Sequence, residues 1–125
     1  MHPIIINGML WRVVQLPLGH PSLVDRTNTM RIATTDPIKK IISIASNIEP
    51  PMLDQVLLHE VMHAITMSYG LLKSLQGIID IYDADEWIAQ ITEKHALEAI
   101  KLTSDALGRP VCINGTCVER IQYGI

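Results

Sequence analysis

The sequence predicts an α+β fold in which a small antiparallel sheet packs on a metal-binding helix and on a second long helix, with a C-terminal β-hairpin. Three observations support this prediction. Short β-branched runs separated by turn residues fill the first 46 positions, as is typical of strands. Apolar residues then recur at helical spacing over 51–69 and 83–107. Finally, Asn114-Gly115, the strongest two-residue hairpin signal, lies between two cysteines near the C-terminus.

The composition is that of one globular domain spanning residues 1–125. Apolar residues make up 48% of the chain and charged residues 18%, which suits a compact core. The net charge of -3 gives no electrostatic reason to expect direct nucleic acid binding. We expect neither a leader peptide nor a membrane partner, because the first 16 residues lack a basic start and no apolar run approaches about 18 residues. The composition carries no prediction of the oligomeric state.

Two hairpins are expected in the N-terminal part. Residues 4–16 form strands around Asn7-Gly8, residues 17–30 are mostly loop, and strands over 31–35 and 40–46 flank Asp36-Pro37. If the strand over 40–46 lies at the sheet edge beside the metal, its backbone could pair with an extended peptide. An ordinary edge strand is the alternative.

Proline and glycine delimit the expected helices. Pro51 suits the first position of a helix that runs to about Tyr69, where Gly70 ends it in the left-handed conformation. A short helix follows over 71–79, and a long helix covers 83–107 before Gly108. The apolar stripe predicted for this long helix consists of Ile88, Ile91, His95, Ala99, Leu102 and Ala106.

The first of the two main helices contains His59-Glu60-Val61-Met62-His63, an HExxH pattern. Positions i and i+4 lie on one face of a helix, so His59 and His63 can share one zinc ion. Glu60 lies one step around the helix, beside the metal, where its carboxylate can take a proton from a metal-bound water. The alternative is a pair of core histidines that hydrogen-bond without a metal.

A catalytic zinc site uses three protein ligands. Glu86, at the start of the long helix and on the edge of its apolar stripe, is the first candidate for the third ligand, and Glu93 and His95 are the alternatives. A structural role competes for Glu86, because Asp83 and Glu86 have the spacing of a helix capping box.

Cys112 and Cys117 flank the predicted C-terminal turn. If Asn114-Gly115 makes the turn, the two cysteines face each other closely enough for a disulfide. In a reducing cytoplasm we expect free thiols instead. Zinc ligation by this pair is a weaker alternative, because structural zinc sites usually show four recognisable ligands.

The HExxH pattern, the preceding apolar strand and a later Glu-x-x-Ala-Gln segment (86–90) resemble the ImmA/IrrE-type metallopeptidases, small gluzincin-like zinc proteins of bacteria and phages. The stretches Trp-Arg-Val-Val, Arg-Ile-Ala-Thr-Thr-Asp and Met-Ser-Tyr-Gly-Leu-Leu are similar to those of small phage or prophage members. The resemblance covers roughly residues 30–100. It implies an α+β fold, zinc held by His59, His63 and Glu86, Glu60 as general base, and residence in the cytoplasm of a bacterial host.

The sequence therefore predicts a zinc-dependent peptidase that hydrolyses a peptide or protein substrate, with Glu60 as the catalytic base. Tyr69, Tyr82 and His95 are candidates for a donor to the developing oxyanion. The alternative is a non-catalytic, metal-stabilised structural or regulatory interaction protein of phage origin. Such a protein would need His59 and His63 but would not depend on Glu60.

Overall fold

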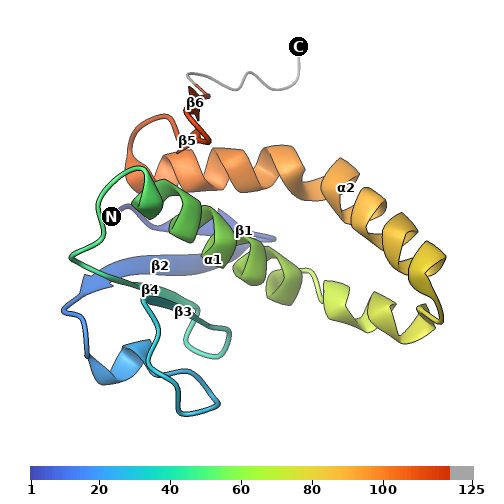
Figure 1. Cartoon of the computed structure of the whole chain (residues 1–125), viewed down its shortest axis with the longest axis horizontal. Helices are drawn as coiled ribbons and strands as arrows, with labels where there is room; N and C mark the ends of the chain where they lie inside the picture. Colours follow the sequence, from blue (N-terminus) through green and yellow to red (C-terminus); the bar gives the residue numbers. More distant parts are fainter. Residues whose placement is uncertain (119–125) are drawn as a thin grey trace.

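The computed structural model describes residues 1–118 and has the predicted α+β architecture, with helix α1 lying across a four-stranded sheet and helix α2 beside α1 (Figure 1). The strands of the sheet are β1 (Ile4–Ile6), β2 (Met9–Leu16), β3 (Ala33–Asp36) and β4 (Ile41–Ala45). The helices are α1 (Met52–Ser68) and α2 (Ile81–Leu107), with two 3-10 helices, η1 (Pro21–Leu23) and η2 (Leu71–Gly77). Strands β5 (Cys112–Ile113) and β6 (Thr116–Cys117) form the predicted C-terminal hairpin.

The sheet is mixed rather than purely antiparallel. Its strand order is β1-β2-β4-β3, and β2 pairs with β4 in parallel while the other two pairings are antiparallel. The pairing is parallel because the chain passes through η1 and β3 between these strands and so enters β4 in the direction of β2. Strand β4 is therefore internal, which corrects the hypothesis that it forms the sheet edge. Its nearly complete burial agrees with an internal position, and β3 takes the edge.

One face of the sheet, one side of α1 and the second half of α2 form the core. Trp11 of β2 faces α1 and donates its indole N–H to the hydroxyl of Ser68 at 2.9 Å. Apolar side chains, many of them β-branched, fill the space between the sheet and α1, as the alternation of side chains along the strands predicts. The fully buried apolar members from the sheet and α1 are Ile6, Ile42, Ile44, Ala45, Leu57, Val61, Ala64 and Ile65.

Helix α1 begins and ends close to the predicted positions. Pro51 is its N-cap, so the helix begins one residue later than expected. Tyr69 is the C-cap, and Gly70 adopts the left-handed conformation with φ of 64°. A glycine is favoured there because it has no Cβ to clash with the backbone.

Helix α2 begins earlier than predicted because a different pair of residues caps it. The carboxylate of Asp80 accepts the backbone N–H of Asp83 at 2.9 Å, and the carboxylate of Asp83 accepts the backbone N–H of Ile79 at 3.2 Å. The first bond satisfies an N–H group that the first turn of a helix leaves without a partner, and the second connects the residue before the N-cap to that turn. The capping pair is therefore Asp80 and Asp83, not Asp83 and Glu86.

Only the second half of α2 belongs to the core. The predicted stripe is buried from His95 onward, but Ile88 is 58% exposed and Ile91 is half-buried. The first half of the helix extends past the end of α1 and has only the short η2 beside it, where the Trp87 indole N–H donates to the hydroxyl of Ser74 (Figure 1). None of the helices within residues 1–118 combines the length and hydropathy needed to cross a bilayer.

A buried ion pair connects the start of α1 to the end of α2. Asp54 is fully buried, and both of its carboxylate oxygens accept hydrogen bonds from Arg109, at 2.6 and 2.8 Å. The backbone N–H of Cys112 donates to the same carboxylate at 2.7 Å. These bonds hold the pKa of Asp54 below its ordinary value, chiefly through Arg109.

The C-terminal hairpin is thereby attached to α1. Cys112 and Cys117 face each other in it, as predicted from the Asn-Gly turn, and they are joined by a disulfide. The structure thus contains the disulfide alternative and not the expected free thiols. The physical reason for the disulfide is that a two-residue turn places the facing α-carbons of a hairpin close enough for the two cysteine side chains to bond.

Removing the guanidinium should destabilise the fold. Arg109→Ala leaves the buried Asp54 carboxylate without its main partner, and we expect a loss of about 2–3 kcal/mol in the free energy of unfolding, less than for a wholly buried pair because Arg109 is partly exposed. Urea denaturation at pH 7 measures this loss. Lys101→Ala is the matched control, because its pair with Asp105 is exposed and should contribute less than about 1 kcal/mol.

The same pair should make the loss depend on pH. A carboxyl whose folded-state pKa is lowered stabilises the fold above its unfolded pKa, and this contribution disappears as the pH falls through the folded-state pKa. The stability difference between the wild type and Arg109→Ala should therefore be complete above about pH 5 and should shrink toward acid. A difference that stays constant down to acid pH would contradict this account of Asp54.

Candidate metal centre

His59 and His63 converge on the exposed side of α1. Their Nε2 atoms lie 3.1 Å apart, and their ring planes meet at 79° with the ring centroids 4.8 Å apart. Two nitrogen ligands of a tetrahedral zinc, each at 2.0–2.1 Å, are separated by about 3.3 Å. The histidine pair therefore has the spacing that two zinc ligands require. The same distance also allows one neutral ring to donate a hydrogen bond to the other.

Glu60 faces the sheet rather than solvent. Neighbouring residues of a helix point about 100° apart, so Glu60 turns away from His59 and toward β3. Its side chain is nearly buried, and one carboxylate oxygen accepts the hydroxyl proton of Thr35 at 2.7 Å. This bond fixes the carboxylate at the boundary between the core and the exposed histidines. Glu60 is thus beside the histidine pair and oriented by a strand.

The third ligand predicted from the sequence does not join this pair. Within residues 1–118, no group of three or more His, Cys, Asp or Glu side chains is placed to hold a metal ion. Glu86 and Glu93 are both exposed on the half of α2 that extends past α1, and Glu86 accepts a hydrogen bond from Gln90 at 3.4 Å. The physical reason is that α2 packs on a different side of α1 from the side that carries the histidine pair. His59 lies about 140° around the helix from Asp54, the residue through which α1 meets the end of α2.

His95, the other alternative, lies beside Tyr69 at the C-terminal end of α1. Its ring packs on Tyr69 with centroids 4.8 Å apart, and its Nδ1 has no hydrogen-bond partner among the described residues. The nearest carboxylate oxygen, from Glu98, is 3.7 Å away. Glu98 instead accepts the Tyr69 hydroxyl at 3.0 Å. Burial and this carboxylate raise the pKa of Tyr69.

These contacts also bear on the expected oxyanion donors. Tyr69 and His95 interact with each other and with Glu98, while Tyr82 is 78% exposed on the first turn of α2. The structure does not bring any of the three to the histidine pair. The Glu60 carboxylate instead accepts a hydrogen bond from the hydroxyl of Thr35.

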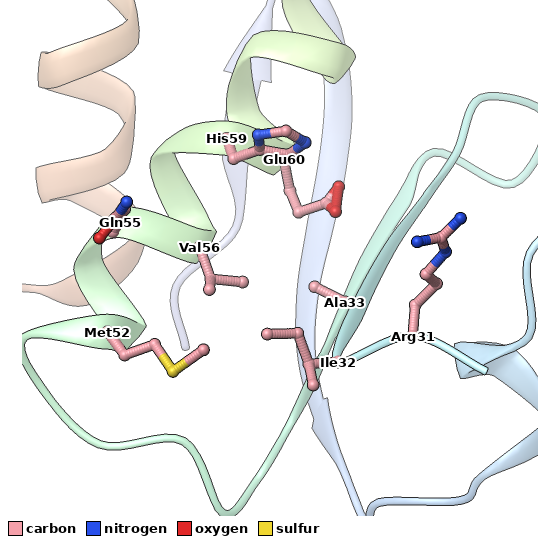
Figure 2. A pocket seen from close by; sticks show the side chains of 8 residues that line it. All are labelled: Arg31, Ile32, Ala33, Met52, Gln55, Val56, His59 and Glu60. Carbon is pink, nitrogen blue, oxygen red and sulfur yellow. The ribbon is translucent and has the colours of Figure 1, made fainter.

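A pocket of about 340 Å³ opens beside Glu60 and His59 (Figure 2). It lies between the first two turns of α1 and the chain that enters β3. Its apolar wall consists of Ile32, Ala33, Met52 and Val56, and its other polar side chains are Arg31 and Gln55. Figure 2 shows Met52 and Val56 on one side and Arg31 on the other, with the Glu60 carboxylate directed toward the strand.

Thr35 and Arg31 are two site residues that the sequence analysis did not single out. The sequence offered a signal for Thr35. This residue shares with Ala33 the face of β3 that meets α1, and a polar side chain on such a face needs a hydrogen-bond partner. Arg31 had no comparable signal. Its place at the pocket depends on how the loop before β3 folds, which the residue pattern does not determine.

The chain was compared with protein-family models, curated proteins and solved structures, and none of the three comparisons gives a match.

The bond between Thr35 and Glu60 predicts a stability difference between two neighbouring threonines. Thr35→Val leaves a nearly buried carboxylate without its donor, so we expect a loss of about 1–3 kcal/mol in unfolding free energy. Thr34→Val is the matched control, because Thr34 points to the other face and donates to an exposed carbonyl of Ser22, which water can replace. Chemical denaturation measures both variants. Equal losses would show that Glu60 does not depend on Thr35.

Proposed function

We propose that this protein is a zinc-dependent peptidase that hydrolyses a peptide bond of a peptide or protein substrate. The observation that supports this proposal is the convergence of His59 and His63, with Nε2 atoms 3.1 Å apart, next to Glu60, which lines the same pocket as His59 and accepts the Thr35 hydroxyl. Two converging histidine ligands and an adjacent base supply part of what metal-assisted hydrolysis uses, and a catalytic zinc site adds a third protein ligand. The pocket along β3 gives a place for the substrate next to them.

The chain's own residues have distinct roles in this mechanism. His59 and His63 would hold the zinc, which when bound supplies a Lewis acid that polarises the scissile carbonyl and acidifies water. Glu60 accepts a proton from the water that attacks the carbonyl carbon, and it returns that proton to the leaving amine as the C–N bond breaks. Thr35 is a positioning residue, because its hydroxyl holds the Glu60 carboxylate.

We further propose that the chain is a small ImmA/IrrE-type protein of phage or prophage origin, acting in the cytoplasm of a bacterial host. The HExxH helix lying across a sheet agrees with that proposal. The exposed position of Glu86 departs from the ligand set that the resemblance implies.

One observation favours a second candidate, a non-catalytic metal-stabilised or regulatory interaction protein. Within the described part of the chain, only two ligand-type side chains converge, and they can also hydrogen-bond to each other without a metal. Two histidines can stabilise a fold through a bound ion without turnover. Such a protein would not require the carboxylate of Glu60.

Zinc content tests the metal centre. We expect the purified protein to contain one equivalent of zinc by mass spectrometry, and His59→Ala to lose it because one of two converging nitrogens is gone. His20→Ala is the control, since His20 lies in the loop before η1, where its ring accepts the N–H of Ser22. Glu86→Ala, measured alongside, shows whether this exposed carboxylate ever reaches the metal. No zinc in the wild type after zinc is added back would remove the basis of the peptidase proposal.

Replacing the base separates the two candidate functions. Glu60→Gln keeps the size of the side chain and its bond to Thr35 but cannot accept the proton, so hydrolysis should fall by about 10²–10⁴-fold while zinc content stays unchanged. The readout is the number of new termini that appear in a tryptic peptide library of a bacterial proteome. If the zinc-loaded wild type creates no more new termini than Glu60→Gln, the non-catalytic candidate is favoured.

A further inference from the structure

Arg31 is held in a defined position at the pocket by the loop that precedes β3. Its Nε donates to the carboxylate of Asp25 at 2.7 Å. Asp25 also accepts the backbone N–H groups of Thr27 and Thr29, at 2.8 and 3.1 Å, and the hydroxyl of Thr27 at 2.5 Å. These donors, first the Thr27 hydroxyl and then Arg31, hold the pKa of Asp25 well below its ordinary range. Asp25 is therefore ionised at neutral pH and pairs with the guanidinium of Arg31.

This arrangement orients Arg31 more than it stabilises the fold. A single exposed ion pair contributes little to stability, and more than half of the Arg31 side chain is exposed. Asp25 accepts from the Nε, and within residues 1–118 neither terminal nitrogen has an acceptor, so both are available to a ligand. Two parallel N–H groups of a guanidinium match the two oxygens of a carboxylate. Figure 2 shows one of these nitrogens pointing to the side of the pocket on which Glu60 lies.

The opposite wall of the pocket is apolar. Met52 is 53% exposed on the first turn of α1, and Val56, one turn later, faces Ile32 across the pocket. A volume of about 340 Å³ is at the small end of ligand sites, large enough for one or two amino acid residues. An apolar side chain that covered Met52 would remove exposed apolar surface from water.

We propose that this pocket binds a peptide segment that combines an apolar side chain with a carboxylate, the side chain lying against Met52 and Val56 and the carboxylate pairing with Arg31. The inference rests on the proposed peptidase function only in calling this peptide a substrate, and the binding itself does not depend on cleavage. The carboxylate can belong to an acidic side chain or to the C-terminus of the peptide. In either case Arg31 is a specificity-determining residue, because it lines the pocket and is not one of the residues assigned to the metal or the proton transfer.

Four peptides test this proposal against zinc-loaded Glu60→Gln, which binds without cleaving. The first pair is acetyl-Ala-Ala-Leu-Glu-Ala-Ala-amide and the same peptide with Gln for Glu. The second pair is acetyl-Ala-Ala-Ala-Leu with a free carboxylate and with an amide. We expect the carboxylate member of one pair to bind about tenfold more tightly by titration calorimetry. The pair that shows the preference identifies the source of the carboxylate.

Two further substitutions assign that preference to the pocket. Arg31→Gln should abolish the tenfold difference, whereas Arg26→Gln, in the same loop but outside the pocket, should leave it intact. Met52→Ala should weaken both members of a pair equally, and it leaves the Asp25 loop untouched, so it tests the apolar half even if Arg31→Gln disturbs folding. Absence of binding by all four peptides, or a preference that survives Arg31→Gln, would overturn the proposal.

Cleavage by the wild-type protein is scored separately. If the preferred peptide binds and depends on Arg31 but the wild type does not cleave it, the pocket is supported and the peptidase function fails. If the wild type cleaves peptides with no preference for a carboxylate, the function is supported and this inference is wrong.

Discussion

The packing of α1 on the sheet is the constraint on which the rest of the site depends. Leu57, Val61, Ala64 and Ile65 are fully buried and together fix the rotation of the helix about its axis. With that rotation, Glu60 points to β3 and the two histidines point away from the core. A rotation by one residue, about 100°, would in one sense move His59 to the buried position of Glu60 and in the other move Glu60 to the exposed position of His59. Core packing, without any metal, therefore already sets the arrangement of the histidine pair and the base.

The position of α2 follows from its two attachments to α1. Asp54 binds Arg109 near one end, and Tyr69 binds Glu98 near the other. These contacts fix an antiparallel register in which the segment between Glu98 and Arg109 runs alongside α1. Glu86 precedes Glu98 by twelve residues, which is about 18 Å along a helix. The register of the two helices, and not the chemistry of Glu86, keeps this carboxylate from the histidine pair.

The parts of the molecule that the sequence predicts are those determined by short-range geometry. The i, i+4 spacing brings His59 and His63 together wherever the helix lies, and Asn-Gly turns specify the first and last hairpins through backbone conformation alone.

The errors concern long-range placement. The periodicity of 88–106 correctly identified a helix, but it could not show that the partner helix ends before Ile88 is covered. In the same way, the apolar strand β4 was recognisable, but its internal position depends on the parallel pairing with β2. Arg31 and Thr35 belong to this class, since each contributes to the site only through a contact with a distant segment.

Strand β3 connects the chemical and recognition halves of the site. It supplies Thr35 to the Glu60 carboxylate, and the chain entering it supplies Ile32 and Arg31 to the pocket. Because β3 is an edge strand, held within the sheet by β4 alone, its position depends on that one pairing and on its packing against α1. A shift of β3 by one residue would turn Thr35 to the other face and move Arg31 along the pocket at the same time. The orientation of the base and the selection of a ligand are therefore coupled through the register of one strand.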